Sequence, residues 1–240
     1  MYNKHMSKKP TKIIGILGGA GPAATANFFQ DIVQIAQNKY GAEQDTDFAK
    51  VYLYNMPMEG FNETGFADAE MVKTQLIEGV KKLESWGADF ITLPCNTVHH
   101  FTKEMREQIS IPIISIVEST VSEIRSNNFK KVGILSSRST RDLNLYKDAI
   151  EKSEISTISA TDDEQNELDN VVLQVMAGKQ GTIEKEIMLR IINRMEALGA
   201  EGIVLGCTEL PLAINQNDSE LKLFNTINVL ANYTVDESYK

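Results

Sequence analysis

The chain has 240 residues, of which 42% are hydrophobic and 24% charged, and its formal net charge is −9. This composition is typical of a globular protein with a normal core, in one large domain or two smaller ones. The negative charge argues against nucleic acid or an anionic membrane as a general partner. No run approaches the roughly 18 apolar residues of a membrane span, and the polar residues 1–12 lack the apolar segment of a signal peptide. Two distant cysteines without a secretion signal favour the cytoplasm.

Short β-branched runs alternate with amphipathic helical patterns in the first half of the chain. The run at 13–17 is apolar throughout, as in a parallel strand buried on both faces. The glycines behind it permit a tight turn, and Pro22 suits the first position of a helix. The strands expected in this half are 13–17, 51–54, 90–93 and 113–116, the helices 23–38, 69–86 and about 98–108, and the turn-rich loop 58–66.

The second half repeats this order. The sequence KVGIL at 131–135 matches the first strand, and residues 136–140 take the place of its glycine turn. An acidic run at 161–165 is expected to form a solvated loop before the next helix. The strands expected here are 131–135, 154–159 and 203–205, and the helices are 141–152, one ending near 176, 183–198, and a closing helix within 211–240.

One pattern occurs twice, as GADFITLPC at 87–95 and GAEGIVLGC at 199–207. Each copy predicts a helix end, a turn, a buried strand and a cysteine at the carboxyl tip of that strand. The duplication predicts two pseudo-symmetric, doubly wound α/β lobes, each a mainly parallel four-stranded sheet flanked by helices. Ligands bind beyond the carboxyl ends of such strands, so we expect an active site between the lobes. The expected organisation is a disordered leader at 1–10, a first lobe at 11–117 completed by 222–240, and a second lobe at 118–221.

The two cysteines, Cys95 and Cys207, suit the inversion of a carbon acid. One thiolate removes a proton from one face while the opposite thiol delivers one, and a helix beginning just after Cys95 would stabilise its thiolate. The developing carbanion needs fixed donors, which Thr97, Thr208 and nearby backbone N–H groups could supply. The alternatives are structural cysteines that act as small hydrophobes, or a redox disulfide, for which the C-x-x-C spacing is lacking.

Two further motifs have simpler interpretations. Residues 19–24 match G-x-G-x-x-A, but the second strand ends without the acidic residue that would hold a ribose, so we expect the glycines to admit a small carboxylate instead of a nucleotide. Adjacent His99 and His100 diverge by about 100° on a helix, which disfavours a shared metal ion. We expect His99 to have a structural hydrogen-bonding role.

Five motifs together resemble the aspartate/glutamate racemase family: GILGGAGP at 15–22, PCNT-x-H at 94–99, KVGILSS-x-ST at 131–140, DDEQ at 162–165 and GCTEL at 206–210. The resemblance covers nearly the whole chain after the leader. It implies a cofactor-independent racemase that works by the two-thiol mechanism and is commonly a homodimer. By motif, Cys95 and Cys207 match its catalytic pair. The positions that would hold the substrate's α-carboxylate and α-amino group are Asn96, Thr97, Thr140 and Thr208.

The remaining candidate substrate-binding residues include departures from that family. Gly19 and Glu209 lie in the matched motifs, and Ser137 stands where a threonine is usual. Asn62 and Met176 fall where the family typically has an arginine and a lysine associated with a side-chain carboxylate, and Ala20 replaces a methionine. Arg138, beside Thr140, could substitute as a bidentate carboxylate partner, or it could face solvent or pair with a surface acid.

The favoured hypothesis is a racemase of an acidic amino acid, aspartate or glutamate, with no cofactor and no metal. A second hypothesis keeps the fold and thiols but changes the substrate, as in hydantoin racemases, maleate isomerases or decarboxylases. A third is a non-catalytic, two-lobed protein that binds a carboxylate.

Overall fold

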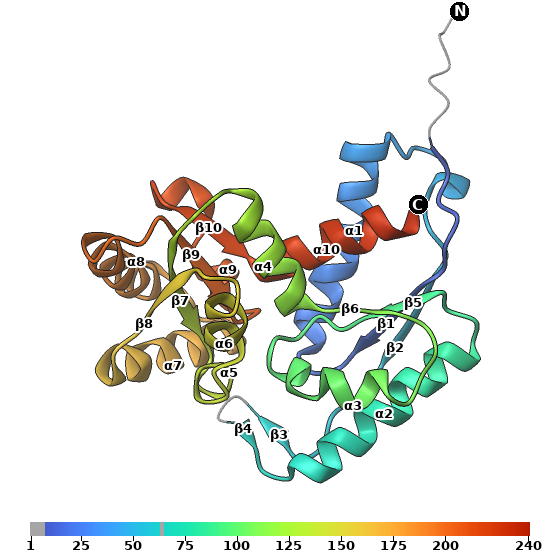
Figure 1. Cartoon of the computed structure of the whole chain (residues 1–240), viewed down its shortest axis with the longest axis horizontal. Helices are drawn as coiled ribbons and strands as arrows, with labels where there is room; N and C mark the ends of the chain where they lie inside the picture. Colours follow the sequence, from blue (N-terminus) through green and yellow to red (C-terminus); the bar gives the residue numbers. More distant parts are fainter. Residues whose placement is uncertain (1–7, 63–64) are drawn as a thin grey trace, which may run out of the picture.

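The computed structural model describes residues 8–62 and 65–240 and shows two lobes side by side (Figure 1). Each lobe is built on a parallel four-stranded sheet flanked by helices, which confirms the predicted fold class. The first sheet has the order β2-β1-β5-β6 and the second has the order β10-β9-β7-β8. The first sheet comprises β1 (Ile14–Gly18), β2 (Val51–Asn55), β5 (Phe90–Thr92) and β6 (Ile113–Ile114), and the second β7 (Lys131–Ser136), β8 (Ser156–Ser159), β9 (Gly202–Gly206) and β10 (Lys222–Asn225).

The two sheets have the same strand order once β7, β8, β9 and β10 are matched to β1, β2, β5 and β6. β1 and β9 are buried along their whole length, as expected for central parallel strands covered on both faces. The helices of the first half are α1 (Pro22–Tyr40), α2 (Ala69–Ser85), α3 (Thr102–Arg106) and α4 (Ile116–Ser126). Those of the second half are α5 (Arg138–Asp142), α6 (Leu145–Glu151), α7 (Asp162–Met176), α8 (Thr182–Ala197), α9 (Leu210–Ala213) and α10 (Thr226–Ser238).

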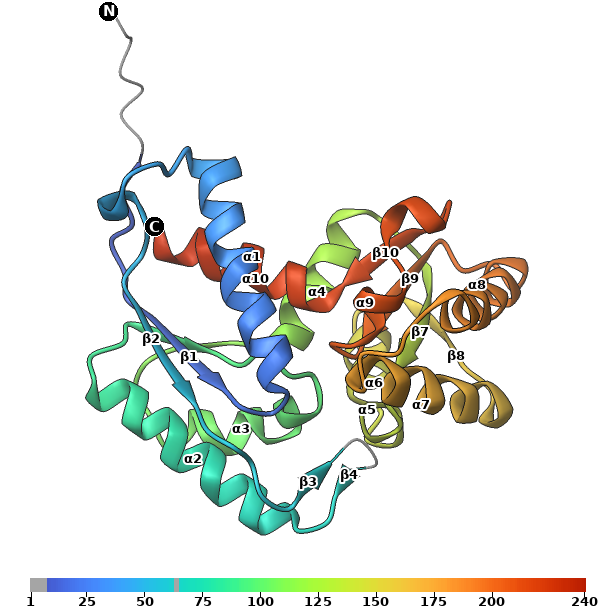
Figure 2. The same cartoon turned by 180° about the vertical axis from the view of Figure 1, so that it is seen from behind.

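The last helix of each half packs across the boundary between the lobes. α4 follows the first sheet and contacts α6 of the second lobe, whereas α10 follows the second sheet and contacts α1 of the first. Both views show α10, in red, running from β10 to lie alongside α1 and α4 (Figures 1 and 2). One apolar cluster therefore spans the lobes and joins Phe28 and Ile16 to Val204 and Tyr146.

The C-terminal segment differs from its predicted place. Residues 222–225 were expected to complete the first lobe, but they form β10, an edge strand of the second sheet. β10 occupies the place in the second sheet that β6 occupies in the first. The sequence repeat ends at the cysteines and includes neither strand. The predicted strand at 113–116 is also too long, because the Ser115 side chain accepts a hydrogen bond from the Glu118 N–H and begins α4.

Three local predictions need correction. The loop at 58–66 contains two short antiparallel strands, β3 (Phe61–Asn62) and β4 (Gly65–Phe66). The run at 161–165 is the start of α7, because Thr161 and Glu164 form a reciprocal capping box. The helix expected at 141–152 is divided between α5 and α6 by Asn144, whose φ of 50° lies in the left-handed region.

The predicted leader, residues 1–10, falls mostly outside the described residues. Within residues 8–62 and 65–240, no helix combines the length and apolar character needed to cross a bilayer.

Candidate active site

The carboxyl ends of the central strands meet around a cavity of about 240 Å³ between the lobes. All the predicted site residues line it except Thr140 and Arg138. Two larger hollows, of about 420 and 910 Å³, contain neither cysteine. The predicted residues that line the cavity are Gly19, Asn62, Cys95, Asn96, Thr97, Ser137, Cys207, Thr208 and Glu209, and the others are Ala20, Gly21, Pro22, Met58, Phe61, Ser139, Val172 and Met176.

The two cysteines follow β5 and β9, the matched strands of the two sheets, and both are free thiols. Burial raises the pKa of Cys95 to about 11 and outweighs the N–H groups of Val98 and Thr97, which act in the opposite direction. Burial, followed by the nearby Glu209, raises the pKa of Cys207 well above its usual value. The thiolate stabilisation expected from a helix after Cys95 is therefore too small. Only a short 3₁₀ turn begins there, at Thr97–Phe101.

Glu209 bonds the Cys207 thiol and lies near the glycine turn of the first lobe. The Cys207 thiol donates to Glu209 Oε2 at 3.0 Å, and the Thr208 hydroxyl donates to the same oxygen at 2.7 Å. The other carboxylate oxygen faces Gly21, where an added Cβ would lie 3.9 Å from it. Glu209 thus favours the protonated form of Cys207.

Gly19 is required by the backbone of the turn. Its φ of 110° is unfavourable for other residues, and an added Cβ would lie 1.8 Å from the carbonyl oxygen of Met56. Its N–H donates to the hydroxyl of Thr25 at 3.2 Å. The glycine therefore shapes the cavity wall while its amide is satisfied internally.

Four hydroxyl groups join the lobes at the floor of the site. Thr97 Oγ1 lies 2.9 Å from Thr140 Oγ1 and 3.1 Å from Ser139 Oγ. Ser137 caps α5 and bonds Thr140 at 3.1 Å. Thr140 therefore contacts the cavity-lining Thr97 across the lobe boundary and does not line the cavity itself.

Asn96, which lines the cavity, has a side-chain N–H donor without a partner. Its side chain is only 3% exposed, its Oδ1 accepts a hydrogen bond from the Tyr146 hydroxyl at 2.5 Å, and its Nδ2 has no partner. A buried polar atom without a partner is costly, so it indicates a group that a ligand completes. Tyr146 is fully buried in α6, and burial raises its pKa.

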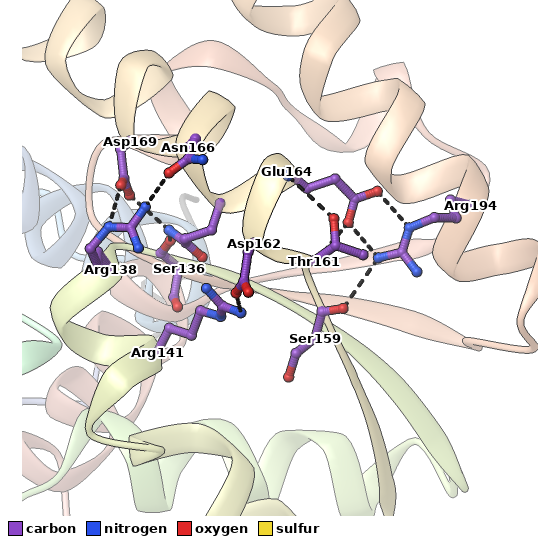
Figure 3. Close-up of polar contacts among 11 residues, drawn as sticks. Ser136, Arg138, Arg141, Ser159, Thr161, Asp162, Glu164, Asn166, Asp169 and Arg194 are labelled. Carbon is purple, nitrogen blue, oxygen red and sulfur yellow. Dashed lines mark hydrogen bonds and ion pairs between the residues drawn. The ribbon is translucent and has the colours of Figure 1, made fainter.

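Arg138 does not reach the cavity. Its guanidinium donates to Asp169 at 2.6 Å and to Asn166 at 2.7 Å, both on α7 (Figure 3). The same figure shows Arg141 paired with Asp162. Of the two roles considered for Arg138, the structure therefore has the pairing with an acid.

The histidines lie outside the site. His99 is buried, its Nε2 contacts the Leu93 carbonyl oxygen at 3.1 Å, and burial lowers its pKa to about 4. Both histidines border the 910 Å³ groove instead. Among the described residues, no group of three or more metal-ligating side chains is present.

Several lining residues were missed by the sequence analysis. Ser139 lies inside a matched motif, so its position in that motif could have indicated it. Phe61 and Val172 carry no local signal, because their place depends on how the β3–β4 hairpin and α7 pack. Tyr146 contacts Asn96 across 50 positions of sequence, which no local pattern reveals.

A two-lobed α/β fold with one free thiol from each lobe in a small shared cavity is the arrangement of a small-molecule binding site. The Asp/Glu/hydantoin racemase family model matches residues 17–234, and the chain belongs to that family. Membership places it among the isomerases.

Similar proteins support this placement along the whole chain. The chain is 28% identical over 223 residues to the broad specificity amino-acid racemase RacX of Bacillus subtilis, covering 93% of this chain and 96% of that one. It resembles the structure of an aspartate racemase homologue from Pyrococcus horikoshii with a TM-score of 0.84 and 27% identity, covering 96% and 100% of the two chains. The aspartate racemase of Picrophilus torridus matches with a TM-score of 0.81 and 26% identity, over 95% and 94%.

Proposed function

We propose that the protein is an amino-acid racemase in which Cys95 and Cys207 transfer protons at Cα without a cofactor. The observation that carries this proposal is that each lobe contributes one free thiol to the same 240 Å³ cavity. That volume lies below the usual range of about 300–1,000 Å³ for drug-sized ligands and suits a molecule of amino-acid size. The relatives named as amino-acid and aspartate racemases support the same reaction class.

The reaction is a proton transfer in two balanced steps. One cysteine, as a thiolate, takes the α-proton and becomes a thiol, leaving a planar carbanion conjugated with the substrate carboxylate. The other cysteine then donates its proton to the opposite face and becomes a thiolate. The Thr97 hydroxyl and the Asn96 amide donate hydrogen bonds to the carboxylate, where negative charge develops, whereas the Thr208 hydroxyl donates to Glu209.

Glu209 helps to keep the proton on Cys207. Because burial raises the pKa of both thiols, we expect them to be protonated at neutral pH before substrate binds. The Cys207 thiol donates to Glu209 Oε2, and this hydrogen bond and the charge of Glu209 both raise the pKa of Cys207. The ammonium group of a bound amino acid adds a positive charge that favours the thiolate.

The homodimer, the cytoplasmic setting and the division into lobes at 11–117 and 118–221 remain predictions, with residues 222–225 belonging to the second sheet. Aspartate and glutamate remain candidate substrates, and their side-chain carboxylate must be compatible with the charges of the cavity.

The test is exchange of the α-hydrogen for deuterium in D₂O, followed with chirality for each amino acid. We expect Cys95→Ser and Cys207→Ser each to lower the rate of racemisation by about 10²–10⁴-fold, because a serine hydroxyl is too weak an acid and base for this step. A protein that only binds a carboxylate would show no exchange at all. Full activity in both variants would contradict the two-thiol mechanism.

A further inference from the structure

The described lining of the cavity carries no positive charge. Its ionisable side chains are Cys95, Cys207 and Glu209. Residues 63 and 64, next to the β3–β4 hairpin and outside the described residues, are glutamate and threonine by sequence and add no cation. A zwitterionic amino acid therefore enters a site whose fixed charge is zero or negative.

The nearby cations are already engaged. Arg138 is held by Asp169 and Asn166, and Arg141 by Asp162. Moving Arg138 into the cavity would leave the Asp169 carboxylate without its partner. A second carboxylate on the substrate would consequently lie near Glu209 without compensation, and a buried unpaired charge is strongly unfavourable.

The lining also contains an apolar part, separate from the polar residues at the strand ends. Met58 precedes the β3–β4 hairpin and Phe61 begins β3, whereas Val172 and Met176 come from α7. Val172 is buried, whereas the side chain of Met176 is 49% exposed. Methionine side chains adapt to ligands of different shape, so this part of the wall accepts apolar groups of more than one size.

We propose that the substrate is a neutral amino acid with an apolar side chain, which Met58, Phe61, Val172 and Met176 receive. This substrate class rests on the proposed racemase function. It replaces the acidic amino acid expected from the family resemblance, because this chain's cavity presents an apolar surface where a side-chain carboxylate would need a cation.

The first experiment compares three substrates whose side chains have similar length: methionine, glutamine and glutamate. The measured quantity is kcat/KM for α-hydrogen exchange in D₂O. Because like charges placed together cost several kcal/mol, we expect methionine to exceed glutamate by about tenfold or more, with glutamine between them. A value for glutamate equal to or above that for methionine overturns the proposed substrate class. No exchange with any of the three overturns the racemase assignment itself, so the two failures are distinguishable.

The second experiment places a cation at the apolar wall. Met176→Lys should raise the ratio of glutamate to methionine kcat/KM by about fivefold, as expected for one partly exposed ion pair. Met176→Gln is the uncharged control and should leave glutamate without this gain. Leu173→Lys adds the same charge on α7 at a side chain that is also 49% exposed but does not line the cavity. An equal change of the ratio in Met176→Lys and Leu173→Lys would overturn the contact between Met176 and the substrate side chain.

Discussion

The orientation of the Asn96 amide is set by a residue on the other lobe. The Tyr146 hydroxyl donates to Asn96 Oδ1 at 2.5 Å, which fixes Oδ1 as the acceptor and leaves Nδ2 without a partner. Because Nδ2 can only donate, the arrangement suits a carboxylate oxygen of the substrate. Under the proposed function, Tyr146 would act as a positioning residue that does not line the cavity itself.

Tyr146→Phe removes this constraint while keeping the ring in the core. We expect KM to rise about fivefold with a smaller change in kcat, because a net hydrogen bond is worth about 1 kcal/mol. Steady-state kinetics measure both constants. The matched control is Tyr40→Phe, which removes a hydroxyl bonded to Asp236 at 2.7 Å away from the site and should leave KM unchanged. An unaltered KM in Tyr146→Phe would contradict the positioning role.

At the level of residues, local sequence predicted the polar part of the site and missed much of its apolar part. Cys95, Thr97 and Thr208 follow strands in short motifs, so their shared edge could be inferred from parallel-sheet geometry. Met58 and Val172 approach the cavity only through tertiary packing. Under the proposed substrate class, that second group would receive the substrate side chain, which is why the sequence indicated the reaction more clearly than the substrate.

At the level of elements, strongly periodic segments were predicted well and their ends less well. The run at 161–165 was interpreted as a loop because its composition is acidic, although Thr161 followed by Glu164 is a capping-box pattern. β10 was missed because its sequence, KLFN, is short and lies beyond the repeated pattern that ends at Cys207. The error at the start of α7 has the larger consequence. This helix carries Asp169 and Asn166, which bind Arg138, and it contributes Val172 and Met176 to the cavity lining.

The N-terminal cap of α7 can be tested directly. Thr161→Ala removes the oxygen that accepts the Glu164 N–H, and we expect a loss of about 1 kcal/mol of unfolding free energy. For a chain of this size that corresponds to a decrease in Tm of about 2–4 °C. Thr161→Ser keeps the hydroxyl and should remain near the wild-type Tm in thermal unfolding followed by circular dichroism. A Thr161→Ala protein as stable as the wild type would contradict the contribution of the cap.

At the level of the whole molecule, a buried histidine makes stability depend on pH. Burial lowers the pKa of His99 from 6.5 to about 4 in the native state. As the pH falls from 6.5 toward 4, the unfolded chain binds a proton that the native state does not. Stability is therefore lost across that window, by up to about 3 kcal/mol.

His99→Gln removes this titration and keeps a donor for the Leu93 carbonyl oxygen. We expect the variant to lose less stability than the wild type between about pH 7 and about pH 4.5 in urea unfolding. His100→Gln is the control, because His100 is exposed on the neighbouring position. Equal pH dependence in the wild type and His99→Gln would show that other groups cause the acid sensitivity.

The packing of α4 and α10 across the lobe boundary has a consequence for how a substrate enters. Each lobe contributes its last helix to the partner lobe, and a single apolar cluster continues through both. Swinging the lobes apart would strip both helices from their packing partners and expose that cluster to water. This packing therefore opposes entry by a wide swing of the lobes and favours a constant separation of the two thiols. Under the proposed mechanism, the exchanged helices would thereby hold the distance between acid and base.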